Sequence, residues 1–170
     1  EDGNILPNDG KALGEIVVRT PWLTQGYFKE VDRSEALWEY GYMHTGDMAT
    51  IEPNGTVMIR DRKKDVIKTG GEWVSSLELE NIISAHPAVQ EVAVVGIPDE
   101  KWGERPFALI VLKQGQSADK DAIHSHLTSY INSGHLSKWA MPDEIRFVSE
   151  IPKTSVGKID KKKIREDMGQ

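Results

Sequence analysis

Three segments of the chain hold side chains whose types and spacing could do chemistry. They are residues 44–47 (His-Thr-Gly-Asp), residues 61–73, which open on Asp-Arg-Lys-Lys-Asp and run through a Gly-Gly pair, and residues 151–160, which contain Thr-Ser-Val-Gly-Lys-Ile. The carboxylate of Asp47 could accept hydrogen bonds from two neighbouring hydroxyls, as on a ribose. The competing interpretation is structural, because an aspartate on a tight turn is more often a turn former.

Lys158 is the cation whose position is most suggestive. It follows Gly157 in a turn rich in small and polar residues, and such a turn can carry an ammonium into a site made by another domain. The basic residues at 161–165 also fit a plain basic surface helix. The Gly157-Lys158 pair is not the end of a phosphate-binding P-loop, because that motif needs Gly at position 152 and Ser or Thr at position 159.

The remaining motifs are more ambiguous. The charges at 61–65 are typical of a solvated linker. The Gly70-Gly71 pair indicates positive φ or the close approach of another group. The five histidines show no metal-ligand spacing, so no metal site is expected. A Gly-x-Ser-x-Gly elbow is absent from the sequence, which counts against a serine hydrolase.

Periodicity and turn signals predict the elements that must position these residues. We expect strands at 15–19, 66–69, 89–97, 105–112 and 144–148, a hairpin at 48–60, and helices after Ser75, at 119–131 and at 160–167. After residue 65 the order β-α-β-β-α-β predicts an α+β domain with helices on one face of a mixed sheet. The composition changes near 61–65, which indicates a β-rich domain at 1–61 and a second domain at 62–170.

Composition excludes several classes of function. The chain has 170 residues, with 27 acidic and 21 basic side chains and a net charge of −6, whereas a general nucleic-acid binder is usually basic. It has no cysteine, which excludes disulfides and thiolate metal sites. The longest apolar runs are far shorter than the roughly 20 residues that span a bilayer, and no leader-like segment opens the chain.

Taken together and in order, the motifs resemble those of the adenylate-forming (AMP-binding) family. The series is Gly-Glu-Ile at 14–16, His-Thr-Gly-Asp at 44–47, Asp-Arg-x-Lys-Asp at 61–65 with Lys-x-Gly-Gly at 68–71, and Pro-Lys-Thr-x-x-Gly-Lys-Ile at 152–159. The resemblance runs from about residue 14 to residue 165. The segment at 70–76 looks most like the medium- and long-chain fatty acyl-CoA ligases.

The resemblance implies a ligase that works in two steps. ATP converts a carboxylic acid to acyl-AMP, and coenzyme A then displaces AMP. By matched position, Asp47 and Arg62 would bind the ribose, and Lys158 would meet the acyl carboxylate and the α-phosphate. Lys64 would be the hinge about which the small domain rotates between the two steps.

Three further residues match positions near the thiol and the nucleotide. Gly71 would lie beside the pantetheine tunnel, where a side chain would block the thiol. Lys68 lies on the strand expected at 66–69, just before this glycine, and would face the site at that stage. Trp73 would stack near adenine. The resemblance implies ATP or AMP, Mg²⁺ and coenzyme A as cofactors of a full-length enzyme, and none held tightly by this piece alone.

The family's phosphate loop and acyl pocket would lie upstream of Glu1. Residues 1–61 would then be the end of the large adenylating domain, residues 62–170 the small C-terminal lid domain, and an N-terminal domain the missing partner. The expected location is the cytoplasm or the surface of a membrane. Two alternatives stay open: an adenylation domain that loads a carrier protein, and a non-catalytic interaction module with the lid fold.

Overall fold

The computed structural model describes residues 3–168, which form two compact units. One unit is Glu1–Lys64 and the other is Asp65–Gln170. The division lies inside the charged segment at 61–65, three residues after the expected boundary. Arg62 belongs to the first unit because it is still paired, opposite Asp47, in the antiparallel sheet of that unit.

The first unit is a three-stranded antiparallel sheet with one short helix. Its elements are β1 (Gly14–Val18), α1 (Val31–Leu37), the 3-10 turn η1 (Glu39–Gly41), β2 (Met43–Ile51) and β3 (Val57–Arg62). The strand order is β1-β2-β3. The predicted strand at 15–19 and the hairpin at 48–60 are confirmed, and Gly55 takes the positive φ of its turn. Helix α1 has no buried residue, so it lacks the apolar stripe by which a helix is recognised.

The second unit is an α+β domain around a five-stranded mixed sheet. Its elements are β4 (Ile67–Thr69), β5 (Glu72–Val74), α2 (Ser76–Ser84), β6 (Val89–Asp99), β7 (Gly103–Leu112), α3 (Lys120–Asn132), η2 (Lys138–Ala140), β8 (Glu144–Phe147) and α4 (Lys161–Met168). The sheet order is β5-β4-β7-β6, and β8 pairs with β7. The β7–β8 pairing is parallel, and the other pairings are antiparallel.

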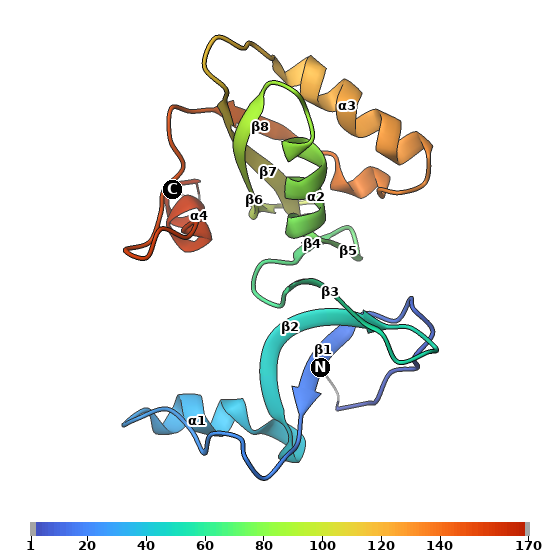
Figure 1. The fold of residues 1–170 in the computed structure, drawn as a ribbon, viewed down its shortest axis with the longest axis vertical. Coiled ribbons are helices and arrows are strands. Elements are labelled where there is room, and N and C mark those ends of the chain that lie inside the picture. Colours follow the sequence, from blue (N-terminus) through green and yellow to red (C-terminus); the bar gives the residue numbers. More distant parts are fainter. Residues whose placement is uncertain (1–2, 169–170) are drawn as a thin grey trace. The chain divides into compact units, whose positions relative to one another are not determined.

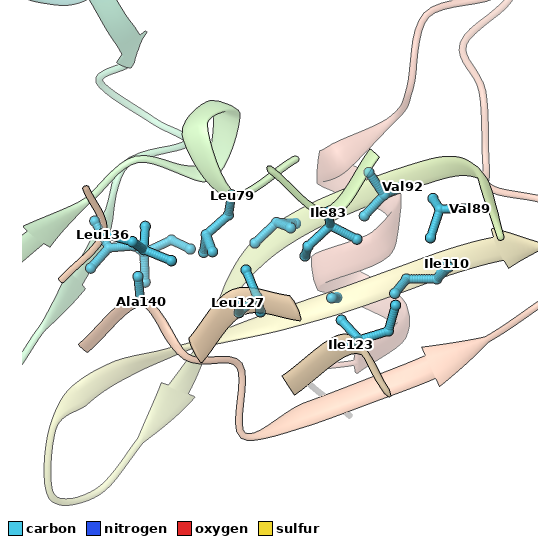
Figure 2. Packing of buried hydrophobic residues seen from close by; sticks show 13 residues of the cluster. Leu79, Ile83, Val89, Val92, Ile110, Ile123, Leu127, Leu136 and Ala140 are labelled. Carbon is cyan, nitrogen blue, oxygen red and sulfur yellow. The ribbon is translucent and has the colours of Figure 1, made fainter. Parts of the chain in front are cut away.

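The main hydrophobic core lies between this sheet and helices α2 and α3. Leu79 and Ile83 of α2 meet Ile123 and Leu127 of α3 over Ile110 of β7, and all five are fully buried (Figure 2). The i, i+4 spacing of these pairs places each on one helical face. Both helices are capped at their N-termini: Ser75, the predicted cap, accepts from the amide of Glu78, and Asp119 accepts from that of Ala122.

A second core covers the opposite face of the sheet. Fully buried Ile164 of α4 and nearly buried Ile151 pack there against side chains such as Phe107. The prediction that all helices lie on one face was therefore wrong for α4 (Figure 1). The strand interiors of β6 and β7 are apolar on both faces, as expected when helices cover both sides.

Candidate functional site

Asp47 and Arg62 form an ion pair at the edge of the first unit. They are directly opposite in the β2–β3 register, and Arg62 Nε lies 2.9 Å from Asp47 Oδ1. The Asp47 side chain is 29% exposed and that of Arg62 is 60% exposed. Asp47 lies in strand β2 rather than on a tight turn, although the preceding Gly46 has a φ of 75°. The pair combines a partly exposed carboxylate, which keeps further acceptor capacity, with an exposed guanidinium.

Glu15 lies next to the Asp47–Arg62 pair and binds its neighbours, although the sequence analysis gave it no role. Its side chain, 12% exposed, meets His44 Nδ1 at 2.9 Å and Lys63 Nζ at 2.8 Å. Its Oε1 also accepts a 2.9 Å hydrogen bond from the amide of Gly46. Burial opposes ionisation, but the hydrogen bonds from Lys63, His44 and Gly46 hold the pKa of Glu15 below its ordinary value of 4.5. Glu15 thus ties β1 to the residues on either side of the Asp47–Arg62 pair.

Lys68, Gly71 and Trp73 lie together on the β4–β5 hairpin of the second unit. Lys68 and Trp73 are opposite in register, and Lys68 Nζ lies 4.6 Å from the Trp73 ring centre, a cation–π contact. Gly71 lies in the connecting turn with a φ of 84°, and a Cβ there would have no heavy atom within 4 Å. The hairpin therefore offers a half-exposed indole, a cation and an open stretch of backbone.

The other glycine of the pair meets a tryptophan cluster that sequence reasoning missed. Trp102 and Trp139 meet edge to face at 4.8 Å. A Cβ on Gly70 would lie 3.2 to 3.4 Å from atoms of these two rings, at a φ of 60°. The buried Arg105 donates to the backbone carbonyl of Trp139 and pairs with Asp143, and so fixes the backbone beside the Trp139 ring. No sequence spacing signals this cluster, because its members are distant in the chain.

Lys158 lies on a separate, well-defined loop of the second unit. Lys153 and Ile159 form an isolated antiparallel bridge at its base. Inside the loop the amide of Thr154 donates to the carbonyl of Lys158 at 2.7 Å, and Gly157 takes a φ of 78°. Lys158 is exposed, and among residues 3–168 its ammonium has no hydrogen bond or ion pair. The loop is ordered by its own backbone and presents the cation to solvent.

The structure thus brings the predicted residues into three groups. Asp47 and Arg62 meet in the first unit, Lys68, Gly71 and Trp73 share one hairpin of the second, and Lys158 stands on its own loop. Lys64 is the last residue of the first unit. In the part of the chain that the structure describes, no three His, Cys, Asp or Glu side chains are arranged to hold a metal ion. Within the same residues, no helix has the length and apolar character to cross a membrane.

Comparison with known proteins finds a matching family model and similar ligases. Residues 78–158 match the model of the AMP-binding enzyme C-terminal domain. The chain is 46% identical over 168 residues to the long-chain-fatty-acid–CoA ligase of Thermus thermophilus, and 42% identical over 167 residues to the 3-methylmercaptopropionyl-CoA ligase of Ruegeria lacuscaerulensis. The alignments cover 98% of this chain and 30% of each relative.

A solved structure agrees over the same length. ATP-bound MatB from Rhodopseudomonas palustris is 33% identical, with a TM-score of 0.83 over 98% of this chain and 32% of its own. The chain thus spans about a third of the length of the proteins it matches. Over residues 78–158 the chain carries the C-terminal domain of the AMP-binding enzymes, and its relatives include acid–CoA ligases.

Proposed function

We propose that residues 1–170 are the C-terminal part of an AMP-forming acid–CoA ligase. The ligase activates a carboxylic acid, specifically a fatty acid, as acyl-AMP and transfers the acyl group to coenzyme A. The observation that carries the proposal is that one chain contains both a partly exposed Asp47–Arg62 ion pair and an ordered loop that presents an exposed ammonium. In this proposal Lys64 is the hinge between the units.

Each group has a physical task in this reaction. Asp47 would accept hydrogen bonds from the ribose hydroxyls, while the planar guanidinium of Arg62, already aligned by Asp47, would reach the same sugar. Lys158 would meet the carboxylate and the α-phosphate, where negative charge grows in the transition state. The Mg²⁺ that accompanies ATP would offset triphosphate charge, and no residue of this chain is assigned to it.

The β4–β5 hairpin suits the second step. Gly71 leaves its surroundings open, so a thiol arm could pass close to the backbone. The cation–π contact fixes Lys68 and Trp73 beside that opening, where they would contact coenzyme A or the nucleotide. A carrier protein that delivers its own pantetheine arm is the second candidate acceptor, because the same opening would serve it.

A fusion protein tests the proposal. The matched segment of the Thermus ligase is replaced by residues 1–170, and the fusion is assayed for acyl-CoA and AMP formation from a fatty acid, ATP and coenzyme A. We expect activity in the fusion, and no carboxylate-dependent ATP–pyrophosphate exchange in residues 1–170 alone, because they match only 30% of the length of the ligase. A folded fusion that binds ATP but forms no acyl-AMP would contradict the proposal. Acyl-AMP without acyl-CoA would instead favour the carrier-protein acceptor.

A further inference from the structure

The side chains that attach helix α4 to the rest of the second unit lie on one face of the helix. Lys161, Ile164, Arg165 and Met168 follow the i, i+3, i+4, i+7 spacing that lines one side of a helix. Ile164 and Met168 pack in the second core. The other two positions are cations, and both are paired with acids elsewhere in the unit. With only eight residues, the helix has little apolar surface, so these ion pairs form a large part of its attachment.

Lys161 joins α4 to helix α2 and strand β6. Its Nζ lies 2.7 Å from Glu80 Oε1 and donates to Ser76 Oγ at 2.8 Å. The same Glu80 oxygen accepts a 2.8 Å hydrogen bond from the amide of Val94. The two charged side chains are only 17% and 14% exposed, so water and salt screen them weakly. Removing either partner would leave a charge in a poorly solvated place.

Arg165 joins α4 to the first residue of the second unit. Its Nη2 pairs with Asp65 Oδ1, and the Asp65 side chain is 12% exposed. Asp65 directly follows Lys64, the proposed hinge. The helix is therefore fastened to the segment at which the unit begins, across 100 positions of sequence.

The same helix fixes the Lys158 loop. Asp160 caps α4 by accepting from the amide of Lys163 at 3.0 Å. Its own amide donates to the carbonyl of Pro152 at 2.8 Å, which closes the base of the loop. Only Ile159 separates Lys158 from this cap. A helix that shifted or frayed would move the loop with it.

We propose that Asp65 and Glu80 are positioning residues for Lys158, because their ion pairs to α4 hold the helix and the loop at 153–159 as one body with the start of the second unit. The role in catalysis rests on the function proposed above. The contacts lie entirely inside the second unit. A rotation at Lys64 would then be transmitted to the Lys158 ammonium without loss, as rigid-body hinge motion requires.

The first experiment measures hydrogen exchange in the 170-residue chain. Asp65→Asn and Glu80→Gln keep size and hydrogen-bonding capacity but remove the charge. We expect amide exchange in α4 and the 153–159 loop to rise about tenfold, which corresponds to about 1.4 kcal/mol, with β6 and β7 amides unchanged. Glu166→Gln is the matched control, since it breaks an exposed ion pair with Lys162 on the same helix and should leave exchange unchanged.

A variant in which the two charges of the Asp65–Arg165 pair are swapped distinguishes the effect of the ion pair from a general loss of stability. Asp65→Arg combined with Arg165→Asp restores an ion pair with opposite polarity and should recover most of the protection in α4 and the loop. Unchanged exchange in the charge-neutral variants would overturn the proposal. Equal acceleration throughout the sheet would overturn it as well, because the effect would then be global unfolding.

The second experiment uses the fusion. Asp65→Asn should lower kcat for ATP–pyrophosphate exchange about tenfold and change KM for ATP less than twofold, because Lys158 acts on the transition state rather than on ATP binding. Thioester formation from supplied acyl-adenylate should be spared. A loosened loop with an unchanged kcat would overturn the positioning role. If the unsubstituted fusion is inactive, the proposed function fails, and hydrogen exchange alone decides whether the ion pairs hold the loop.

Discussion

Lys158 and Lys161 are three residues apart and carry the same charge, but their side chains differ in burial and in ion pairing. Lys161 is paired with Glu80 and mostly buried, whereas Lys158 projects from a turn without a partner among residues 3–168. Lys158 lies in the turn at Gly157, which has a positive φ, whereas Lys161 opens the helix and faces Glu80. The ammonium of Lys161 holds the structure together, and that of Lys158 is available to a ligand.

Lys158→Ala in the fusion tests the availability of that ammonium. We expect adenylation to fall by about 10²–10³-fold, the usual effect of removing one preorganised charge stabiliser. Thioester formation from supplied acyl-adenylate should change little. Lys162→Ala, which removes an exposed cation from the same basic run, is the control and should affect neither step. Equal loss of both half-reactions would assign Lys158 a structural or shared role.

Asp47→Ala tests whether the Asp47–Arg62 pair binds nucleotide. Loss of the carboxylate should weaken ATP binding to the fusion by about 1.5–3 kcal/mol, the range for hydrogen bonds to charged groups. Titration calorimetry with ATP measures this, and thermal unfolding of the same variant measures the structural contribution. The pair is partly exposed, so its direct contribution to stability should be below about 1 kcal/mol. A variant that loses stability but keeps its ATP affinity would make Asp47 a structural residue.

At the scale of elements, the junction after β3 is the part that the proposed hinge requires to move. The proposed hinge implies that φ and ψ at Lys64 differ between the arrangements for the two half-reactions. Lys64→Pro fixes φ near −65° and restricts residue 63. We expect acyl-adenylate to form at a near-normal rate in the fusion and thioester synthesis to fall by orders of magnitude, measured as separate half-reactions. Lys64→Ala is the control, because it removes the charge but leaves φ and ψ unrestricted, and damage equal to that of proline would refute the hinge.

Regular elements with an apolar period could be predicted from the sequence, and contacts between distant segments could not. The capped helices after Ser75 and Asp119 appear where local signals place them. The short strand β5 (Glu72–Val74) was missed because it directly follows the Gly70-Gly71 break and contains no apolar run, and α1 was missed because it buries no residue. The side of the sheet that α4 covers depends on Ile164 reaching the second core, which no local pattern encodes.

The candidate site divides in the same way. Motif order located Asp47, Arg62 and Lys158, because these residues lie in short, recognisable stretches. Glu15 and Arg105 were missed as anchors because their partners lie 29 to 48 and 34 to 38 residues away. A charged residue in a strand gives no sign, in sequence alone, of which distant groups it will hold.

For the molecule as a whole, the lowered pKa of Glu15 leads to a prediction of how the stability of the first unit depends on pH. Because its pKa is lower in the folded chain than the usual 4.5, the unfolded chain binds more protons between the two values. Stability from this group is therefore complete above pH 4.5 and is lost as pH falls through the folded pKa. In a series of thermal unfolding curves, Glu15→Gln should reduce the dependence of the melting temperature on pH below 4.5. An unchanged slope would show that other carboxylates dominate.

The edge-to-face contact of Trp102 with Trp139 also makes the second unit visible to spectroscopy. Two indoles held rigidly at 4.8 Å in an asymmetric surrounding couple their electronic transitions, and such coupling gives circular dichroism that a mobile, solvated indole lacks. Trp22, in the first unit, is 86% exposed and should add little to that signal. The near-ultraviolet spectrum therefore gives a label-free optical reporter of the Gly70 turn, which lies against both rings.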